Sequence, residues 1–593
     1  MNPTSAHPAK IPVRAALPAW RATAVWAAVT LAFATIMVQA WRAQVEHGQF
    51  LRDQGAQRYL RHFPLPVQRG SIFDRHGKPL ALSVPVKTLW VDPQIFSQQH
   101  QKWPQVAADL GISVNELQTR VHNGGSHFAF IARQIDPERA EKITALRVPG
   151  LYSLNENRRY YPAGSIAAPL IGFTNVDGNG IEGLELAYNQ WLTGKAGEET
   201  GLRDNYGHPL SLRGPAHAAQ PGKALTLSID RHLQYVAYTS LASAVQRFQA
   251  RSGAAVLMDA QSGEVLAMVS YPAFNPNDRS DYQAALYNNR AIADTFEPGS
   301  VMKPFTIAAA LDDQSIQPDA TFNVNTNCFR VARFCIQDDV RHNNLDLAQV
   351  LKYSSNIGAA KISLRTPPAD LFHMLRQAGF GQSSGLGLPG ESSGTLPAWQ
   401  GWDIARRAAM AYGYGLSVTP LQLAAAYGAI ANQGVYVAPT LIRQENPGAK
   451  GTRIMPAATA ARLTQWLTGV TGPGGTGFLA SIPGYSVAGK TGTSIIANGK
   501  GGFHKNQVNT TFVGFAPARN PRLVMAVVVR GPTQGWRYGG VVAAPVFRVT
   551  MAAALQSMGI QPNPALLESA TAAHQASASE TQRWAEGVGD AAH

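Results

Sequence analysis

The sequence predicts an α+β fold that follows a single N-terminal transmembrane helix, and three patterns support this class. Residues 22–41 are apolar and carry no charge, as a membrane-spanning helix requires. The apolar runs 254–260 and 264–270 flank Gln261-Ser262-Gly263, a spacing typical of a β-hairpin. Three more strand-like runs follow Tyr485, and mostly helical patterns fill the residues between. We expect the hairpin and the three later strands to join in one antiparallel sheet, since chain ends commonly lie close together.

Length and charge limit the class of protein. With 593 residues, the chain is too long for one ordinary core, so its length suggests about three to four domains, or fewer if they are large. The net charge of +14 comes from scattered basic residues without interleaved aromatics, which argues against nucleic acid as a partner. Anionic lipid headgroups or an anionic cell-wall polymer suit this charge better.

The N-terminal apolar run is predicted to be an uncleaved membrane anchor. At about 1.5 Å per residue, a helix over 22–41 spans the roughly 30 Å hydrocarbon core. Trp20 and Trp41 stand at its ends, where indole rings favour the membrane interface. A cleaved signal peptide is the alternative, but its apolar core would be shorter and would precede a small-residue cleavage site. Here Arg42 follows directly.

Basic residues before the apolar run predict its orientation. Lys10, Arg14 and Arg21 place residues 1–21 in the cytoplasm by the positive-inside rule, with Arg42 as a mild counter-signal. The rest of the chain is then exported. We therefore expect a single-pass membrane protein whose bulk lies outside the cytoplasmic membrane.

Cys328 and Cys335 are the only cysteines. In an oxidising exported compartment they can close a small local loop, and two free thiols are the alternative. They make a poor metal site, because no further Cys or His partners them. We expect a disulfide that staples the loop locally and takes no part in the chemistry, and we expect neither a metal nor a cofactor.

The exported part is predicted to begin with a module over 42–222. Residues 42–63 indicate a polar, helical stalk. A strand, a turn at His76-Gly77-Lys78 and a second strand follow, and residues 104–147 have mostly helical patterns. The Gly-rich stretch 158–194 is expected to contain tight turns.

The Pro/Gly-rich segment 214–222 predicts a boundary before a second module over 223–560. Residues 546–558 are predicted to form a helix that packs on this module. From Gln561 to His593 the chain is rich in Ala, Ser and Glu with few apolar residues, which predicts a disordered tail.

Three short motifs in the second module carry the predicted chemistry. They are Ser300-Val301-Met302-Lys303, Ser354-Ser355-Asn356 and Lys490-Thr491-Gly492. Each alone has an ordinary explanation, respectively a capping serine, a helix start and a β-turn. In this order and at this spacing, they match the S-x-x-K, S-x-N and K-T-G set of acyl-serine enzymes.

Ser300 is the predicted nucleophile, and Lys303 is its predicted base. Ser300 stands just before an apolar helical pattern, and Pro304 fits because it lies in the first turn. The start of a helix favours developing negative charge. Lys303 lies three residues on and shares the face of Ser300. A lysine can act as a base only when it is partly neutral, which burial or a nearby positive charge promotes.

The other two motifs are predicted to complete the site. Ser354 can pass a proton to a leaving amine, and Asn356 can hold a substrate amide with both its donor and its acceptor. Lys490 adds a positive charge, which would lower the pKa of Lys303 and attract a substrate carboxylate.

The K-T-G segment also supplies hydroxyl groups and backbone donors. Thr491 and Thr493 can offer hydroxyls to the substrate carboxylate, and Gly492 would let a substrate backbone lie along the strand. The backbone N–H groups of Ser300 and Thr493 can form an oxyanion hole.

At these residues the chain closely resembles the class B penicillin-binding proteins, and among them the division-specific septal peptidoglycan D,D-transpeptidases of Gram-negative bacteria. The resemblance runs from the anchor to about Met558. It rests on the catalytic segments EPGSVMKPFT, YSSNIGAAK and AGKTGT. It rests equally on non-catalytic segments, namely QRGSIFDRHGKPLA, RRYYPAG with GIEGLE, GYGLSVTPLQLAAAYGAIANQG and YGGVVAAPVF.

The resemblance implies the penicillin-binding transpeptidase fold, an antiparallel five-stranded sheet flanked by helices, on an elongated α+β pedestal. Residues 42–222 would be the pedestal, of the dimerisation type, and residues 223–560 the transpeptidase domain. It implies attack on the terminal D-Ala-D-Ala amide of a stem pentapeptide, an acyl-enzyme on Ser300, and its resolution by the amine of a neighbouring stem. β-Lactams would acylate the same serine.

The resemblance also implies partners. Because the pedestal segments fill the region up to Gly222, no glycosyltransferase domain is expected. A membrane glycosyltransferase and other division proteins would therefore act with this chain. Two departures bear on substrate and antibiotic selectivity, namely the apolar Ser494-Ile495-Ile496 and the individual region around the cysteines.

Other functions remain as alternatives. The cell-elongation transpeptidase shares the architecture and all three motifs, although the compact pedestal and the segment VPVKTLWVDP favour the septal type. A β-lactamase or a penicillin-sensing receptor does not need the pedestal. A non-catalytic division scaffold would be free to lose Ser300, Lys303 or Lys490.

Overall fold

The computed structural model divides the chain into two compact units, Met1–Pro66 with Ala196–Gln220 and Val67–Lys195 with Pro221–His593. The predicted pedestal over 42–222 contributes to both. The structure describes residues 18–47, 49–50, 60–65, 67–203, 209–278, 280, 283–445, 451–497 and 503–567.

The first unit contains the apolar helix α1 (Ala19–Trp41) and a short π-helix, η1 (Arg42–Glu46). Thr30 and Thr35 each donate their hydroxyl to the carbonyl four residues earlier at 2.8 Å, so these polar groups are satisfied within the apolar helix. Within the described ranges, this is the one helix long and apolar enough to cross a membrane.

A three-stranded antiparallel sheet completes the first unit, in the order β1 (Leu60–Leu65), β6 (Gly197–Arg203) and β7 (Pro209–His217). The predicted helical stalk over 42–63 is thus wrong at its end, because the chain from Leu60 pairs with a strand far along the sequence. Residues 51–59 of that stalk lie outside the described residues. Strand β7 also enters the predicted boundary segment.

In the second unit, one sheet contains the strands β2, β3, β4, β5 and β8. Strands β2 (Ile72–Phe73) and β3 (Pro79–Val91) pair antiparallel around the predicted turn at Gly77. Strand β3 also pairs with β4 (Ala129–Ile135) and β5 (Leu151–Tyr160), and β2 pairs in parallel with β8 (Leu225–Thr226).

Strand β4 corrects the mostly helical prediction for 104–147. Ala129 and Ile131 are buried whereas Phe130 is exposed, the alternation of a half-covered strand. Helices do flank it, namely α3 (Pro93–Phe96), η2 (Ser97–Lys102), α4 (Trp103–Leu110), α5 (Val114–His122) and α6 (Pro137–Thr144). Their apolar faces form one core with β3 and β4.

A buried ion cluster joins three of the non-catalytic segments, QRGSIFDRHGKPLA, RRYYPAG and GIEGLE. The Glu185 carboxylate accepts from Arg69 Nε and from Arg159 Nε, each at 2.7 Å, and Glu185 is fully buried. Gly183 just before it has φ +60°, and a Cβ there would lie 2.6 Å from the nitrogen of Gly172. The surrounding short helices are η3 (Gly164–Ile166), α7 (Ala168–Ile171), α8 (Gly183–Ala187) and α9 (Asn189–Thr193).

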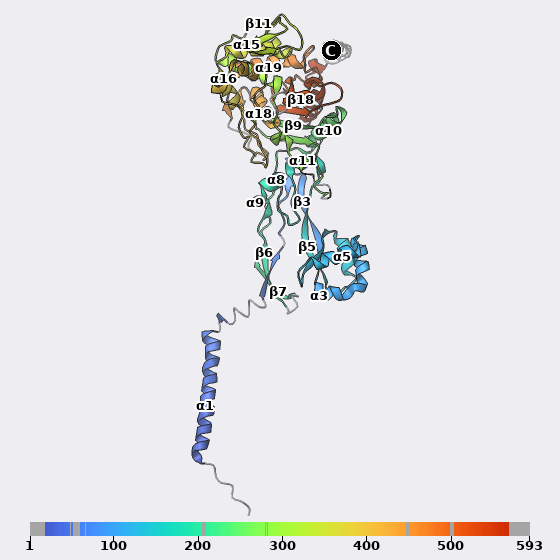
Figure 1. The fold of residues 1–593 in the computed structure, drawn as a ribbon, viewed down its shortest axis with the longest axis vertical. Coiled ribbons are helices and arrows are strands. Elements are labelled where there is room, and N and C mark those ends of the chain that lie inside the picture. The colour runs from blue at the N-terminus through green and yellow to red at the C-terminus, as the bar shows by residue number, and fades with distance from the viewer. Residues whose placement is uncertain are drawn as a thin grey trace, which may run out of the picture. The chain divides into compact units, whose positions relative to one another are not determined.

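The predicted five-stranded sheet is present, with antiparallel strands in the order β10-β9-β19-β18-β17. Its strands are β9 (Ser252–Asp259), β10 (Val265–Tyr271), β17 (Ala488–Ala497), β18 (Phe503–Ala516) and β19 (Leu523–Arg530). The hairpin β9–β10 therefore joins the later strands through the pairing of β9 with β19. In Figure 1, β9 lies near β18, which is the next strand after β19 in the sheet.

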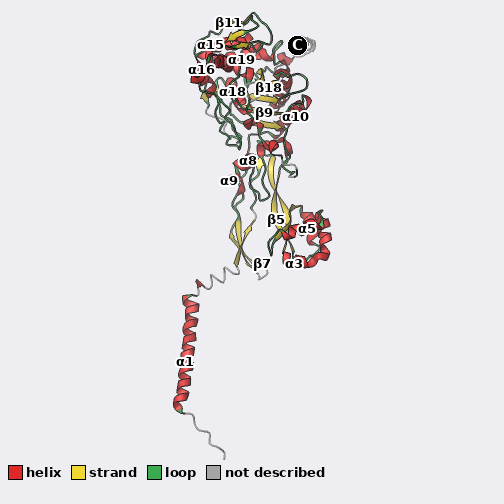
Figure 2. Cartoon of the chain, viewed as in Figure 1, coloured by secondary structure: helices red, strands yellow, loops and turns green. Residues whose placement is uncertain are grey.

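Helices cover both faces of this sheet. Adjacent residues of β9 enter different cores, Val256 on the side of α18 (Pro420–Ala431) and Leu257 on the side of α10 (Arg231–Arg247) and α21 (Ala544–Ser557). Figure 2 shows α15, α16, α18 and α19 gathered to one side of the strands, with α10 on the other.

The remaining elements lie between β10 and β17 in the sequence, except α20, which follows β19. The helices are α11 (Ala284–Tyr287), α12 (Arg290–Ala293), η4 (Gly299–Met302), α13 (Lys303–Asp312), α14 (Leu347–Lys352), α15 (Asn356–Arg365), α16 (Pro368–Gln377), η5 (Trp399–Gly401), α17 (Ile404–Met410), α19 (Ala457–Thr471), η6 (Phe478–Ala480) and α20 (Gly539–Val542). Three two-stranded pairs are β11 (Thr321–Asn323) with β14 (Asn344–Asp346), β12 (Phe329–Val331) with β13 (Phe334–Ile336), and β15 (Val435–Tyr436) with β16 (Thr452–Arg453).

The start of the predicted disordered tail is packed. The backbone N–H of Asn563 donates to the carbonyl of Gly484 at 2.7 Å, and the Tyr485 hydroxyl donates to the carbonyl of Ile560 at 2.7 Å. Residues up to Leu567 therefore belong to the folded second unit. Residues 568–593 lie outside the described residues.

Candidate active site

Ser300 lies at the start of a buried helix, as predicted, but on a short 3₁₀ turn. That turn is η4, and α13 continues from it at Lys303 with Pro304 in its first turn. Gly299 has φ +64°, and a Cβ there would lie 3.1 Å from the carbonyl oxygen of Thr493. Glycine before Ser300 therefore lets this turn approach β17, the strand that carries Lys490.

Lys303 is fully buried beside a partly exposed Ser300. Its Nζ lies 2.9 Å from Ser300 Oγ and 2.8 Å from Asn356 Oδ1, and it also contacts the carbonyl oxygen of Ser354. A neutral amine has two N–H bonds and one lone pair. In this neutral form, the two oxygens that can only accept take the two N–H groups, and the lone pair can accept from the hydroxyl of Ser300.

Burial lowers the pKa of Lys303 to about 7, although the carboxylates of Asp338 and Asp339 act to raise it. Near pH 7 a large fraction of this side chain is therefore neutral. The combination of contact and lowered pKa is what a general base requires.

Ser354 joins the two lysines. Its Oγ lies 3.1 Å from Lys303 Nζ and 2.8 Å from Lys490 Nζ. Ser354 has φ +60°, a backbone conformation that a serine adopts at some cost. The next residue, Ser355, caps α15 by accepting from the N–H of Gly358 at 2.9 Å.

Lys490 reaches the site from β17 and is fully buried. Burial first, and then the neighbouring Lys303, lower the pKa of Lys490 well below its usual value. Two adjacent buried amines cannot both hold a proton easily, so an anion bound nearby would favour the charged form of Lys490.

The two threonines of the third motif are placed differently from Lys490. The Thr491 Oγ1 lies 2.8 Å from Thr476 Oγ1, and Thr493 Oγ1 accepts from the N–H of Gly539 at 3.3 Å. Because side chains alternate along a strand, both lie on the opposite side of β17 from Lys490. Thr493 is partly exposed and retains its own O–H donor, whereas Thr491 is buried.

Gly492 has a structural reason that the sequence-based argument missed. A Cβ at this position would lie 3.0 Å from the carbonyl oxygen of Pro298 and 3.0 Å from Val301 Cγ1. The glycine therefore lets η4 pack directly against β17, which holds the first and third motifs together.

Further residues that the motif reasoning missed support the site. The hydroxyl of the buried Tyr427 in α18 donates to the carbonyl of Val301 at 2.7 Å, behind the nucleophile turn. Asp338 accepts from the N–H of Ile357 at 2.9 Å and from the Ser355 hydroxyl, at the start of α15. Tyr427 lies in the segment GYGLSVTPLQLAAAYGAIANQG that carries part of the resemblance, but only its tertiary contact reveals this role, and no motif marks Asp338.

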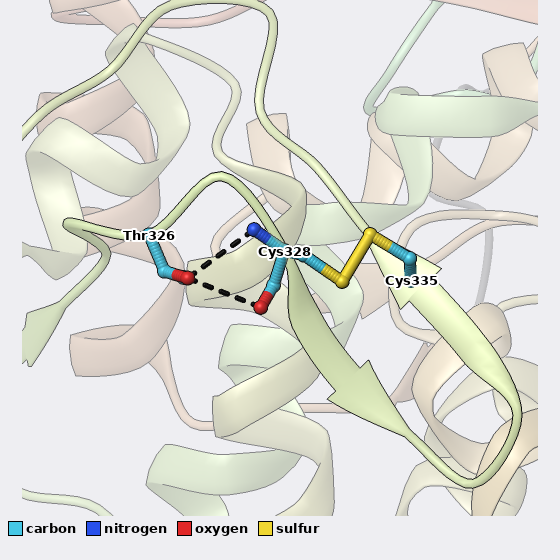
Figure 3. Close-up of a disulfide and its surroundings, with 3 residues drawn as sticks. All are labelled: Thr326, Cys328 and Cys335. Carbon is cyan, nitrogen blue, oxygen red and sulfur yellow. Dashed lines mark hydrogen bonds between the residues drawn. A yellow bond between two sulfur atoms is a disulfide. The ribbon is translucent and has the colours of Figure 1, made fainter.

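The cysteines lie beside this support. Cys328 and Cys335 are joined by a disulfide with their Cα atoms 5.2 Å apart, and Thr326 Oγ1 bonds to the backbone of Cys328 (Figure 3). Within the described ranges, no three His, Cys, Asp or Glu side chains are grouped as the ligands of a metal would be.

A buried lysine beside a serine, with a second lysine and an asparagine in contact, defines the class of serine acyltransferases that form an ester intermediate. The comparisons specify the family. Residues 253–552 match the penicillin binding protein transpeptidase domain, and residues 64–227 match the penicillin-binding protein dimerisation domain. The chain belongs to the penicillin-binding proteins, and to their class B of the FtsI type.

Relatives of known name cover nearly the whole chain. The peptidoglycan D,D-transpeptidase FtsI of Escherichia coli K12 is 38% identical over 550 residues, which cover 92% of this chain and 93% of the relative. The probable peptidoglycan D,D-transpeptidase PbpC of Pseudomonas aeruginosa is 38% identical, over 88% of this chain and 92% of its own length.

Solved structures agree with the fold. Penicillin-binding protein 3 of Mycobacterium tuberculosis, complexed with aztreonam, superposes with a TM-score of 0.65 at 28% identity over 85% of this chain and 99% of that one. The apo transpeptidase domain of penicillin-binding protein 3 from Burkholderia pseudomallei gives 0.53 at 39% identity, over 57% of this chain and 97% of that one.

Proposed function

We propose that this protein is a septal peptidoglycan D,D-transpeptidase, which cross-links stem peptides during cell division through an acyl-serine intermediate and is inhibited by β-lactams. The observation that carries the proposal is the 2.9 Å contact between Ser300 Oγ and the buried Lys303 Nζ, whose pKa is lowered to about 7. The named relatives are D,D-transpeptidases, which supports the same reaction.

Acylation starts at Ser300. Its oxygen attacks the carbonyl of the penultimate D-Ala as Lys303 takes the hydroxyl proton. The oxyanion is stabilised by the backbone N–H groups of Ser300 and Thr493, which are brought near by the packing of Gly299 against the backbone of Thr493. Collapse of this intermediate breaks the amide bond and leaves an ester on Ser300.

The leaving D-alanine needs a proton on its nitrogen. Ser354 Oγ lies between the two lysine amines and can deliver it, taking a replacement from Lys490 or Lys303. The amine of a second stem then attacks the ester, and the same groups act in reverse. A β-lactam keeps its leaving nitrogen tethered after ring opening, so the ester persists.

The substrate carboxylate is recognised by charge. Lys490 is the proposed partner, and Thr491 holds the strand through its contact to Thr476. Binding of the carboxylate would raise the pKa of Lys490 and keep the proton there, which leaves Lys303 as the neutral base.

Location follows from the anchor. Helix α1 fits a single-pass inner-membrane protein. We place residues 1–21 in the cytoplasm and the transpeptidase domain over 223–560 in the periplasm. A membrane glycosyltransferase that polymerises the glycan, together with other division proteins, is the proposed partner set, docking on the anchor and the pedestal over 42–222.

The test is product formation from a stem pentapeptide substrate. The purified full chain should release D-alanine and, given an amine acceptor, form the cross-linked dimer. Ser300→Ala should do neither. Hydrolysis of penicillin with rapid turnover would instead indicate a β-lactamase, and rescue of a depleted strain by Ser300→Ala would indicate a scaffold.

A further inference from the structure

The disulfide-bonded hairpin ends directly beside the second motif. Strands β12 and β13 pair from Phe329 with Ile336, and the disulfide joins Cys328, which precedes β12, to Cys335 in β13. The next two residues, Gln337 and Asp338, both bond to the S-x-N segment. The hairpin and the catalytic segment are therefore connected through two consecutive residues.

Gln337 fixes which end of the Asn356 amide faces the base. The Asn356 Nδ2 donates to the carbonyl oxygen of Gln337 at 3.1 Å, while Oδ1 accepts from Lys303 Nζ at 2.8 Å. The two ends of an amide are chemically opposite. If the Gln337 carbonyl moved away, the amide could turn and present N–H groups to Lys303, which would displace one of its two acceptors.

Asp338 holds the start of α15. One carboxylate oxygen accepts from the N–H of Ile357 at 2.9 Å, and the other accepts from the Ser355 hydroxyl. These bonds hold the residues directly after Ser354, which has the left-handed φ of +60°. A serine in that conformation persists only when its surroundings hold it.

The hairpin is weak without its covalent link. Each strand has three residues, Val331 and Ile336 supply its buried side chains, and Phe334 is exposed. A two-stranded hairpin of this size is marginal alone. A disulfide restricts the conformations open to the loop, so it keeps Gln337 and Asp338 at their positions.

We propose that the disulfide-bonded hairpin over 328–336 is a positioning part of the active site, acting through Gln337 and Asp338 on Asn356 and Ser355. This inference rests on the proposed transpeptidase function. It departs from the expectation that the disulfide is a local staple unconnected with the chemistry. Asp338 is accordingly a positioning residue and does not touch the reacting atoms.

The test compares acylation by a fluorescent penicillin in full-length variants. Cys328→Ala with Cys335→Ala removes the link, Asp338→Ala removes the carboxylate, and Asp338→Asn keeps a hydrogen-bond acceptor. Phe334→Ala is the matched control, because it changes the exposed side of the same hairpin. The melting temperature is measured for each protein.

We expect the cysteine variant and Asp338→Ala each to acylate about 10- to 100-fold more slowly, because small misplacements of catalytic groups have effects of this size. Asp338→Asn should recover most of the loss, and Phe334→Ala should acylate at the wild-type rate. In a double-mutant cycle, removing the disulfide in Asp338→Ala should cost less than about twofold, since both act on one segment.

Acylation at the wild-type rate without the disulfide would overturn the proposal, as would equal losses in Phe334→Ala or fully additive losses in the cycle. Should the cysteine variant not fold, wild-type protein reduced with a phosphine replaces it, and its rate must fall and then return on reoxidation. Failure of wild-type protein to acylate at all would refute the proposed function and is distinguishable from these outcomes.

Discussion

At the scale of single residues, the account depends on the protonation of Lys303. Its Nζ contacts Ser300 Oγ, Asn356 Oδ1 and the carbonyl oxygen of Ser354, and burial lowers its pKa to about 7, so a large fraction of the side chain is neutral near pH 7. The charged groups that face it are Lys490 from β17 and the carboxylates of Asp338 and Asp339 from the loop after β13. Burial lowers the pKa of Lys303 and the two carboxylates act to raise it, and this balance sets the pH at which the base becomes available.

Acylation should therefore rise with pH. Because the reactive form of Lys303 is neutral, its fraction grows as the pH passes through the pKa of about 7. We expect the second-order acylation constant to be about tenfold lower at pH 6 than at pH 8. Stopped-flow mixing with a fluorescent penicillin measures it, and a constant that is flat or falls over this range would contradict the assignment.

Replacing the base should nearly abolish acylation while leaving the protein folded. Lys303→Ala should acylate about 10²- to 10⁴-fold more slowly, since general-base catalysis contributes that much. The exposed Lys142 of α6 provides the control, because Lys142→Ala changes charge far from the S-x-x-K motif in sequence and should leave the rate unchanged. Full-rate acylation by Lys303→Ala would show that another group takes the proton.

At the scale of elements, helix α18 holds η4, the turn that carries Ser300. The buried hydroxyl of Tyr427 is the partner of the Val301 carbonyl at 2.7 Å. On the other side, Gly492 lets β17 pack against the same turn. The turn is thus fixed between a fully buried helix and the edge strand of the sheet.

Tyr427→Phe should lower the free energy of unfolding of the second unit by about 1–2 kcal/mol, because it leaves a buried carbonyl without its partner. Urea unfolding followed by intrinsic fluorescence measures this loss. Tyr235→Phe on α10 removes an exposed hydroxyl and should change it little. Equal stability of the two variants would mean that water replaces the Tyr427 bond.

The buried ion cluster of Arg69, Arg159 and Glu185 should contribute more to the free energy of unfolding than any exposed ion pair. Glu185→Gln leaves Arg69 and Arg159 buried without a counter-charge, which should cost about 3 kcal/mol. Thermal unfolding measures the change, with Glu138→Gln on the surface of α6 as its control. A loss no larger than in the control would show that the arginines find other partners.

Local patterns predicted the elements whose partners are close in sequence. The hairpin β9–β10, the turn at Gly77 and the start of α13 were all predicted, since turn residues and apolar spacing mark them. Strand β1 was not, because its partner β6 begins at Gly197, far along the sequence. Strand β4 was missed for the same reason, since it pairs with β3 across an intervening run of helices.

The site itself was predicted as far as the motifs extend. The structure connects Ser300, Lys303, Ser354, Asn356 and Lys490 through a chain of contacts that runs over the amines of the two lysines. Thr491 and Thr493 instead lie on the opposite side of β17 from Lys490. Asp338 and Tyr427 could not be found, since their role depends on tertiary contacts across long sequence separations.

At the scale of the whole molecule, one apolar helix precedes two modules that both match a penicillin-binding family. The orientation proposed for this helix can be tested directly. In spheroplasts treated with protease, a tag at the C-terminus should be degraded, whereas a tag at the N-terminus should be protected until the membrane is opened. The reverse pattern would refute the placement of the catalytic module in the periplasm.

The central claim is that Ser300 is the acylated nucleophile, and peptide mapping of the penicillin adduct tests it most directly. After brief exposure to a penicillin, mass spectrometry should locate a stable ester on the peptide that contains Ser300, and Ser300→Ala should show none. An adduct on another residue, or a folded wild-type protein that forms none, would contradict the account.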